Sequence, residues 1–291
     1  MHSLTLKSPA KLNLSLKVIG RRPDGYHELV TLFHRISLCD EISFTKKAEG
    51  VSIHSSNKEL PCDKSNLIAK AYSLLKEKYP EMGGISVAIK KNIPIAAGLG
   101  GGSSNAASTL LALNQLYDLR LSRKVLARFG TKLGADIPFF LYEMNQAIGA
   151  GIGEKILSRA AKGKHWFLLV VSNKGLMTKE VYRELSPKER TGSLTKEMAT
   201  ARILCKLLDC KDFAKASRLL RNDLEPAAFR LRASIKKMLD HLLKLGAFTA
   251  RMSGSGPTIF AIFSSRKQAE QLASKVRLVP PYNRVIVCHS K

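Results

Sequence analysis

The chain has 291 residues, 45% of them hydrophobic, and its 48 lysines and arginines outweigh 23 aspartates and glutamates for a formal charge of +25. This hydrophobic content excludes an intrinsically disordered chain and predicts one large or two medium domains. Its apolar runs fall far short of the roughly 20 residues that cross a bilayer, and its first residues do not resemble a secretory signal. We therefore expect a cytoplasmic protein with no membrane partner.

Strand patterns dominate the start of the chain. Alternating polar and apolar residues predict strands, the first interrupted at Pro9, over residues 4–18, 29–38, 41–45 and 51–54. Helical periodicity then predicts a helix over 65–79, and a strand is expected over 85–93.

A glycine-rich segment follows that strand and opens a long helix to about Tyr117, with a further helix over 122–133. In the rest of the chain we expect strands over 166–171, 258–263 and 284–288, and helices over 195–208, 213–220, 231–245 and 267–276. Because strands cluster before the first helix instead of alternating with helices, the fold class is α+β, with two domains, 1–155 and 156–291.

The excess positive charge is a first indication of nucleic-acid binding. The basic residues are nevertheless dispersed singly or in pairs, most of the excess falls in residues 156–291, and no nucleic-acid-binding motif accompanies them. We expect no dedicated nucleic-acid partner. The five cysteines form no Cys-x-x-Cys pair and the seven histidines are scattered, so no metal site is predicted.

Residues 94–104, called the glycine loop below, have the composition of an anion-binding segment. Four glycines let the backbone present its N–H groups, and a helix starting near Ser103 directs its positive end to the same point. Ser103 and Ser104 are expected to cap that helix and to offer hydroxyls to phosphate or Mg²⁺. The Walker A sequence Gly-Lys-Ser/Thr is absent, and Ser103 replaces the last glycine of a dinucleotide-binding loop.

Two charged residues lie in apolar sequence. Lys11 lies in Pro-Ala-Lys-Leu-Asn-Leu and Asp136 in Leu-Gly-Ala-Asp-Ile-Pro. They are either a structural ion pair or a catalytic pair, in which the aspartate accepts a hydroxyl proton and the lysine stabilises developing charge.

Three motifs resemble those of the kinases of galactose, homoserine, mevalonate and phosphomevalonate. They are residues 9–14, residues 94–107, which begin with the glycine loop, and Met-Ser-Gly-Ser-Gly-Pro at 252–257. Within that superfamily, Gly-Arg-Arg-Pro-Asp-Gly-Tyr-His-Glu-Leu at 20–29 is similar to the members that phosphorylate a cytidine diphosphate derivative of methylerythritol. The resemblance implies a two-domain small-molecule kinase with its active site in a cleft between the domains.

The resemblance also implies ATP-dependent phosphorylation of the 2-hydroxyl of the methylerythritol moiety in non-mevalonate isoprenoid biosynthesis. Its catalytic pair is Lys11 and Asp136. The positions that bind the cytidine substrate are Asn13, Tyr26, His27, Thr178 and Tyr182. The positions that bind ATP are Asn66, Lys91, Pro94, Gly98, Leu99, Gly100, Gly101, Gly102, Ser103 and Ser104.

In this interpretation ATP is the co-substrate and Mg²⁺ is held mainly by ATP and water, with no protein metal ligand assigned. We expect a monomer or a weak homodimer. The alternatives are another kinase of the superfamily, of the homoserine or mevalonate type, or a basic nucleic-acid-binding protein on a kinase fold.

Overall fold

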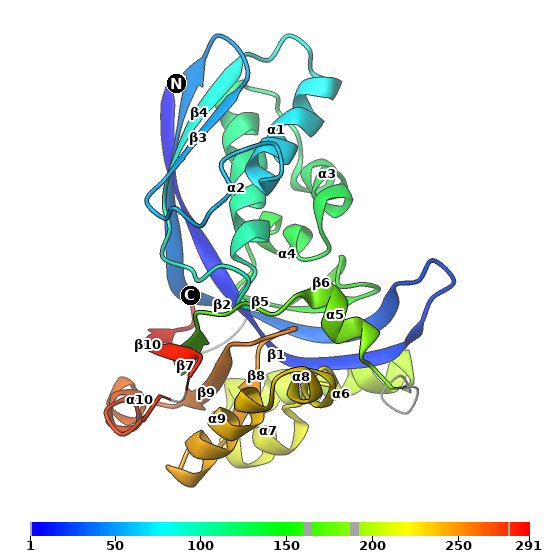
Figure 1. Ribbon diagram of the computed structural model, residues 1–291. Helices are drawn as coiled ribbons and strands as arrows, with labels where there is room; N and C mark the ends of the chain where they lie inside the picture. The colour runs from blue at the N-terminus through cyan, green and yellow to red at the C-terminus, as the bar shows by residue number, and fades with distance from the viewer. Residues whose placement is uncertain (1, 160–163, 187–191, 279) are drawn as a thin grey trace. The chain divides into compact units, whose positions relative to one another are not determined.

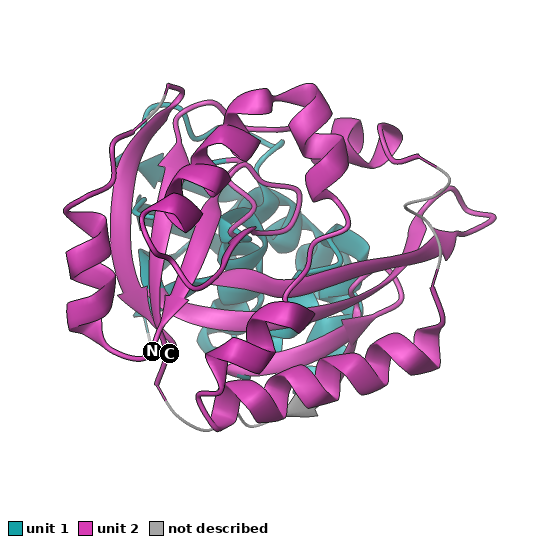
Figure 2. Ribbon diagram, turned by 90° about the horizontal axis from the view of Figure 1, so that it is seen from below, with its two compact units in different colours: residues 1–10, 38–95, 100–144 teal, residues 11–37, 96–99, 145–291 magenta. Residues whose placement is uncertain are grey.

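The computed structural model describes residues 2–159, 164–186, 192–278 and 280–291, and the chain divides into two compact units (Figure 2). Unit 1 consists of residues 1–10, 38–95 and 100–144, and unit 2 of residues 11–37, 96–99 and 145–291. The units are therefore interleaved along the chain, and a single boundary near residue 155 stays a prediction.

Two long strands, β1 (Ser3–Arg21) and β2 (His27–Lys47), each contribute to both units. The predicted break at Pro9 is wrong, because β1 continues through it; proline removes one donor, but its fixed φ is compatible with extended backbone. The two strands expected over 29–38 and 41–45 are likewise one strand, β2.

Unit 1 consists of strands and a group of helices (Figure 1). β2 pairs antiparallel with β4 (Gly84–Lys90), and β3 (Val51–Ser55) pairs parallel with β4. The parallel pair needs a crossover connection, which α1 (Leu67–Lys78) supplies. The other helices are α2 (Gly101–Leu116), α3 (Arg123–Leu133) and α4 (Ile137–Leu141). Most residues of α2 are buried, as its alanine- and leucine-rich sequence requires.

Unit 2 contains a four-stranded antiparallel sheet in the order β10-β7-β9-β8. These strands are β7 (Trp166–Ser172), β8 (Ala250–Met252), β9 (Ile259–Phe263) and β10 (Tyr282–His289). In this unit β2 also pairs antiparallel with β5 (Gln146–Ala150), which pairs with β6 (Lys155–Arg159). The helices are α5 (Thr178–Arg183), α6 (Leu194–Asp209), α7 (Phe213–Leu219), α8 (Glu225–Leu231), α9 (Ala233–Lys244) and α10 (Arg266–Ala273).

The core of unit 2 joins the sheet to these helices, with Leu168, Val170, Ile259, Met238 and Leu242 fully buried. Sequence patterns did not predict the short elements β5, β6, β8, α4, α5 or α8. In the part of the chain that the structure describes, no helix is long and apolar enough to span a membrane.

Candidate active site

The glycine loop has the backbone of an anion-binding turn. Gly98 and Gly100 have φ values of +75° and +68°, which glycine adopts without strain. Helix α2 begins at Gly101 with Gly100 as its N-cap, and no side chain caps it. The N–H groups of the first helical turn have no partner within the helix and lie at its positive end, where they can bind phosphate oxygens.

The expectation that Ser103 and Ser104 cap the helix is wrong, because both lie inside its first turn. Ser104 is fully buried and its Oγ accepts a hydrogen bond of 2.8 Å from Ser8 Oγ. Ser103 is half-buried. Leu99 as a whole is 1% exposed.

Two further ATP- or substrate-side residues of unit 1 lie beside the first turn of α2. Asp136 is the half-buried N-cap position of α4. A Cβ placed on Gly134, two residues earlier, would lie 3.9 Å from Ser103 Oγ, so this turn is close to the glycine loop. On another side, a Cβ on Gly102 would lie 3.5 Å from Leu67 Cδ1, next to Asn66 at the start of α1.

Asn66 itself stabilises the start of α1. Its Oδ1 accepts the N–H of Ile68 at 2.9 Å and its Nδ2 donates to Pro61 O at 2.6 Å. Unit 1 thus brings together Asp136, Asn66 and the serine-containing turn of α2.

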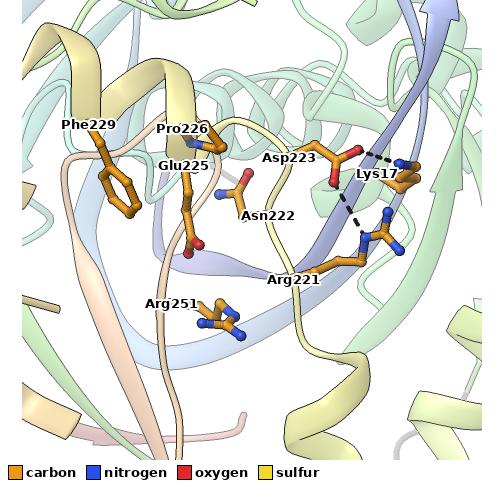
Figure 3. Close-up of a pocket in the computed structure, with 8 residues that line it drawn as sticks. All are labelled: Lys17, Arg221, Asn222, Asp223, Glu225, Pro226, Phe229 and Arg251. Carbon is orange, nitrogen blue, oxygen red and sulfur yellow. Dashed lines mark hydrogen bonds and ion pairs between the residues drawn. The ribbon is translucent and has the colours of Figure 1, made fainter. Parts of the chain in front are cut away.

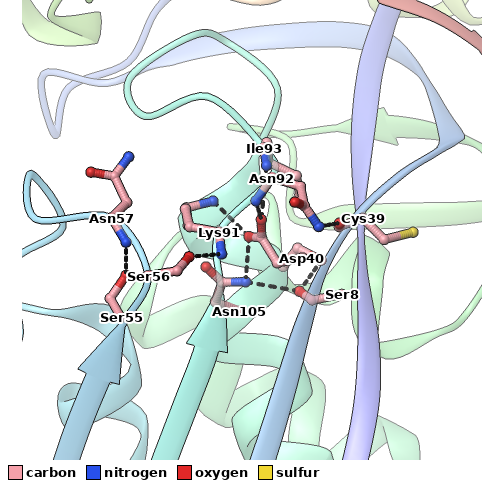
Figure 4. Close-up of polar contacts among 11 residues, drawn as sticks. Ser8, Cys39, Asp40, Ser55, Ser56, Asn57, Lys91, Asn92, Ile93 and Asn105 are labelled. Atoms are coloured by element: carbon pink, nitrogen blue, oxygen red, sulfur yellow. Dashed lines mark hydrogen bonds and ion pairs between the residues drawn. The ribbon is translucent and has the colours of Figure 1, made fainter.

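A buried carboxylate that sequence reasoning missed, Asp40 of β2, connects several of these elements (Figure 4). Its Oδ1 accepts the backbone N–H groups of Asn92 and Ile93 at 2.8 Å each. Its Oδ2 accepts hydrogen bonds from Lys91 Nζ at 2.6 Å and from Asn105 Nδ2 at 2.9 Å, and Asn105 Nδ2 also donates to Ser8 Oγ at 3.0 Å. We call these six residues the Asp40 cluster.

Lys91 is therefore part of a buried ion pair. Its side chain is 3% exposed and that of Asp40 is 0% exposed. Burial lowers the pKa of the Lys91 ammonium, and the Asp40 carboxylate opposes that shift. Its Nζ lies 3.2 Å from where a Cβ on Gly101 would be, so a side chain at that position would crowd the ion pair.

The second predicted lysine, Lys11, is held by neutral oxygens in unit 2. Its Nζ donates to Asn13 Oδ1 at 2.5 Å and to Gly98 O at 3.2 Å, and its backbone N–H donates to Leu99 O at 3.0 Å. Asn13 Nδ2 donates to Thr31 Oγ1 at 2.8 Å, which fixes the amide orientation. Lys11 and Asn13 are 4% and 3% exposed.

The motif at 252–257 lies against this pair. Ser253 Oγ donates to Gly98 O at 3.0 Å and accepts the N–H of Asn13 at 3.3 Å. A Cβ on Gly254 would lie 2.9 Å from Asn13 Oδ1 and 3.4 Å from Lys11 Nζ, so only glycine permits this approach. We call Lys11, Asn13, Thr31, Gly98 and Ser253 the Lys11 cluster.

Asn222 holds the motif in place. Its Nδ2 donates to Met252 O and Gly254 O, both at 2.7 Å, and Glu225 Oε1 accepts the N–H of Met252 at 2.9 Å. Burial raises the pKa of the Glu225 carboxyl, while that N–H opposes the shift. Ser253 and Gly254 lie in a motif that the sequence analysis recognised, but the sequence alone assigned neither residue a role.

Asn222 also lines a pocket of about 360 Å³ (Figure 3). Its other lining residues are Lys17, Arg221, Asp223, Glu225, Pro226, Phe229 and Arg251. Lys17 and Arg221 both pair with Asp223, at 3.1 and 3.4 Å. The pocket therefore lies beside the support of the 252–257 motif and contains none of the predicted site residues.

The residues expected to bind cytidine form a second group in unit 2. The rings of His27 and Tyr182 are stacked, with centroids 5.2 Å apart and planes at 29°. Tyr26 is 61% exposed, which leaves its ring free to pack on a ligand. Thr178, the first residue of α5, has its Oγ1 2.8 Å from Ser255 Oγ in the 252–257 motif.

The predicted residues thus divide between the units. Lys11, Asn13, Gly98, Leu99 and the cytidine group belong to unit 2, whereas Asp136, Asn66, Lys91, Pro94 and residues 100–104 belong to unit 1. No group of three or more metal-ligating histidine, cysteine, aspartate or glutamate side chains occurs among the residues described.

Family models identify the class of protein. The model for the N-terminal domain of GHMP kinases matches residues 66–144, and the model for the C-terminal domain of GHMP kinases matches residues 199–280. The chain is a small-molecule kinase with the two-domain fold of this class.

The curated relatives and solved structures are more specific. The 4-diphosphocytidyl-2-C-methyl-D-erythritol kinase of Syntrophus aciditrophicus is 38% identical over 92% of both chains, and that of Geobacter metallireducens is 39% identical over 95% of both. A crystal structure of 4-(cytidine 5'-diphospho)-2C-methyl-D-erythritol kinase superposes with a TM-score of 0.80 at 32% identity, covering 98% of each chain. This chain belongs to the 4-diphosphocytidyl-2-C-methyl-D-erythritol kinase family.

A homoserine kinase structure from Cytophaga hutchinsonii has a TM-score of 0.75 at 20% identity, covering 100% of this chain and 95% of that one. At that identity the likeness shows the shared fold alone.

Proposed function

We propose that this protein transfers the γ-phosphoryl group of MgATP to the 2-hydroxyl of 4-diphosphocytidyl-2-C-methyl-D-erythritol, a step of non-mevalonate isoprenoid biosynthesis. The observation that carries the proposal is the 37–39% identity, over most of both chains, to kinases of that name. The Lys11 cluster supports it, because it brings residues of all three superfamily motifs into contact within unit 2.

Asp136 is the proposed proton acceptor. The 2-hydroxyl oxygen forms a bond to the γ-phosphorus, its proton passes to the Asp136 carboxylate, and ADP leaves with the electrons of the broken P–O bond. The Lys11 ammonium stabilises the negative charge that develops on the transferred group. Asn13, which binds Lys11 Nζ through Oδ1, keeps the ammonium in one position and lies beside the reacting hydroxyl.

The glycine loop and the first turn of α2 bind the triphosphate through backbone N–H groups. Magnesium enters as part of the MgATP substrate, so phosphate oxygens and water supply its ligands. The half-buried Ser103 hydroxyl is the one protein oxygen that we assign to the phosphates and their metal. Asn66, Lys91 and Pro94 lie on the adenosine side; Lys91 contributes through its backbone, since its side chain is buried and its ammonium binds Asp40.

Cytidine is bound by the second group of unit 2. Tyr182 and Tyr26 pack on the base, His27 hydrogen-bonds to its edge, and Thr178 contacts the substrate near Ser255. A different base would leave buried polar groups unmatched, at about 1–3 kcal/mol for each.

We also place the protein in the cytoplasm, where ATP is available and where its five cysteines, all free thiols, are stable. A monomer or a weak homodimer suffices, because this chain supplies every residue assigned to the site.

An ATP-consumption assay with three acceptors tests the proposal. Purified protein is expected to consume ATP with 4-diphosphocytidyl-2-C-methyl-D-erythritol, and not with homoserine or mevalonate. Turnover of homoserine or mevalonate without turnover of the cytidine compound would contradict it.

A further inference from the structure

The Asp40 cluster joins the two ends of the segment that contains the glycine loop. Ile93 directly precedes the loop and Asn105 directly follows it, and both donate to the same carboxylate. N–H groups that bind a triphosphate must keep fixed mutual positions, since misplacement by about 1 Å can cost roughly 100-fold in activity. A carboxylate bonded at both ends restricts how far those ends can move apart.

The carboxylate is suited to this task because it is rigidly held. Asp40 is fully buried and accepts four hydrogen bonds, two from backbone N–H groups and two from side chains. Lys91, also buried, balances its charge at 2.6 Å. The cluster lies directly against the first helical residue, since a Cβ on Gly101 would be 3.0 Å from Ile93 Cγ2 and 3.2 Å from Lys91 Nζ.

We propose that Asp40 is a positioning residue for ATP, which fixes the start of the glycine loop relative to the first turns of α2, and that Lys91 is its buried counter-ion. The proposal rests on the proposed function, which assigns the triphosphate to this loop. Asp40 touches no substrate; it acts through the backbone of residues 92–93 and through Asn105.

The exposed ion pair between Glu41 of β2 and Lys90 of β4 provides a matched control. Glu41 is paired with Lys90 in the β2–β4 register, and their side chains are 48% and 68% exposed with 3.9 Å between charged atoms. Glu41→Gln removes a carboxylate one residue away from Asp40, by the same chemical change, without touching the loop.

The experiment measures two affinities in the full-length protein: the dissociation constant of a non-hydrolysable ATP analogue by calorimetry, and the KM of the cytidine substrate. Asp40→Asn is expected to raise the dissociation constant of the ATP analogue by roughly 10- to 100-fold. The KM of the cytidine substrate is expected to stay within about twofold of the wild-type value. Glu41→Gln is expected to change neither. Wild-type affinity for the analogue in Asp40→Asn, or an equal loss for both ligands, overturns the proposal.

Two more variants separate positioning from direct contact and from misfolding. Lys91→Met is expected to weaken binding of the ATP analogue less than Asp40→Asn does. A larger loss of affinity would mean that the ammonium contacts the nucleotide, which overturns the proposal.

If Asp40→Asn does not fold, Asn105→Leu provides the test, because it removes the hydrogen bond from α2 to Asp40 without leaving a charge unpaired. Asn105→Leu is expected to weaken binding of the ATP analogue without changing the KM of the cytidine substrate, and unchanged affinity for the analogue overturns the proposal. Failure of wild type to bind the analogue would instead contradict the proposed function.

Discussion

The two polar clusters of this kinase hold glycine-containing segments by different chemistry. In unit 1 the Asp40 cluster is organised by an ion pair whose two side chains are almost wholly buried. In unit 2 no carboxylate takes part in the hydrogen bonds described to Gly98 and Gly254: the Lys11 ammonium and the Ser253 hydroxyl donate to Gly98 O, and the Asn222 amide donates to Gly254 O.

This difference in chemistry predicts how much stability the protein loses when a residue of each cluster is substituted. Removing one partner of a buried ion pair leaves an uncompensated charge, which costs about 3–5 kcal/mol. Removing a neutral amide leaves unsatisfied polar groups that cost about 1–3 kcal/mol, and less where water can replace it. The unit 1 cluster is therefore expected to be the more sensitive to single substitutions.

The largest effect is expected on turnover. Asp136→Asn removes the proposed proton acceptor, so kcat should fall by roughly 10²- to 10⁴-fold while the ATP analogue binds as in wild type. Steady-state kinetics and calorimetry measure the two quantities. Near-normal kcat in this variant would exclude Asp136 as the base and leave unit 1 with a binding role only.

The largest effect on stability is expected at the ion pair. Asp40→Asn should lower the free energy of unfolding by about 3–5 kcal/mol, whereas Glu41→Gln, in an exposed pair, should change it by less than about 1 kcal/mol. Urea unfolding of both variants measures this difference. Equal, small losses would mean that the buried pair does not behave as coupled charges.

Acid should act mainly on unit 2. His34 in β2 is fully buried, with Nδ1 3.2 Å from Gln146 Nε2, and burial lowers its pKa to about 3, with a further contribution from the nearby His165. Between that pKa and the ordinary value near 6.5, the unfolded state binds a proton that the native state does not, so stability falls as pH falls through this window.

The loss should reach about 2 kcal/mol between pH 6.5 and pH 5. His34→Asn should flatten the pH dependence of the unfolding free energy, while His54→Asn, at an exposed histidine of unit 1, should leave it unchanged. A slope equally steep in His34→Asn and wild type would assign the acid sensitivity to other groups.

A loss of stability smaller than that at the buried ion pair is expected at Asn222. Asn222→Ala frees two backbone carbonyls, but the side chain lines the 360 Å³ pocket, so water can replace it and the cost should be about 1 kcal/mol. Because the 252–257 motif then loses its support beside Lys11 and Asn13, kcat should fall as well.

Asp223→Asn is the matched control, since Asp223 binds Lys17 and Arg221 and makes no hydrogen bond to the motif in the described structure. It should show a similar loss of stability with unchanged kcat. Equal turnover in the two variants would deny Asn222 a positioning role.

Local sequence patterns predicted much of this molecule. The helices α1 and α2 and the glycine loop follow from periodicity and composition, whereas β1 and β2 were each predicted in two pieces. The Lys11 and Asp136 segments were distinguished by charged residues in apolar surroundings. Assignment of roles to those two residues needed the family resemblance, because an isolated pattern does not separate a structural pair from a catalytic one.

Other features depend on contacts between residues far apart in the chain. In the sequence nothing distinguishes Asp40 from other strand residues. Its role depends on contacts with Lys91 and Asn105, which lie 51 and 65 positions further along the chain. Asn222 contacts a motif 30 residues later. The helix start at Gly101 was missed because a left-handed glycine took the place of the expected serine cap.

The position of the transferred phosphate tests the central claim most directly. In 4-diphosphocytidyl-2-C-methyl-D-erythritol the carbon at position 2 bears a methyl group and no hydrogen. Phosphorus NMR of the product should therefore show a new monophosphate signal without vicinal coupling to a proton. A new signal split by protons would place the phosphate on a primary or secondary hydroxyl and contradict the account.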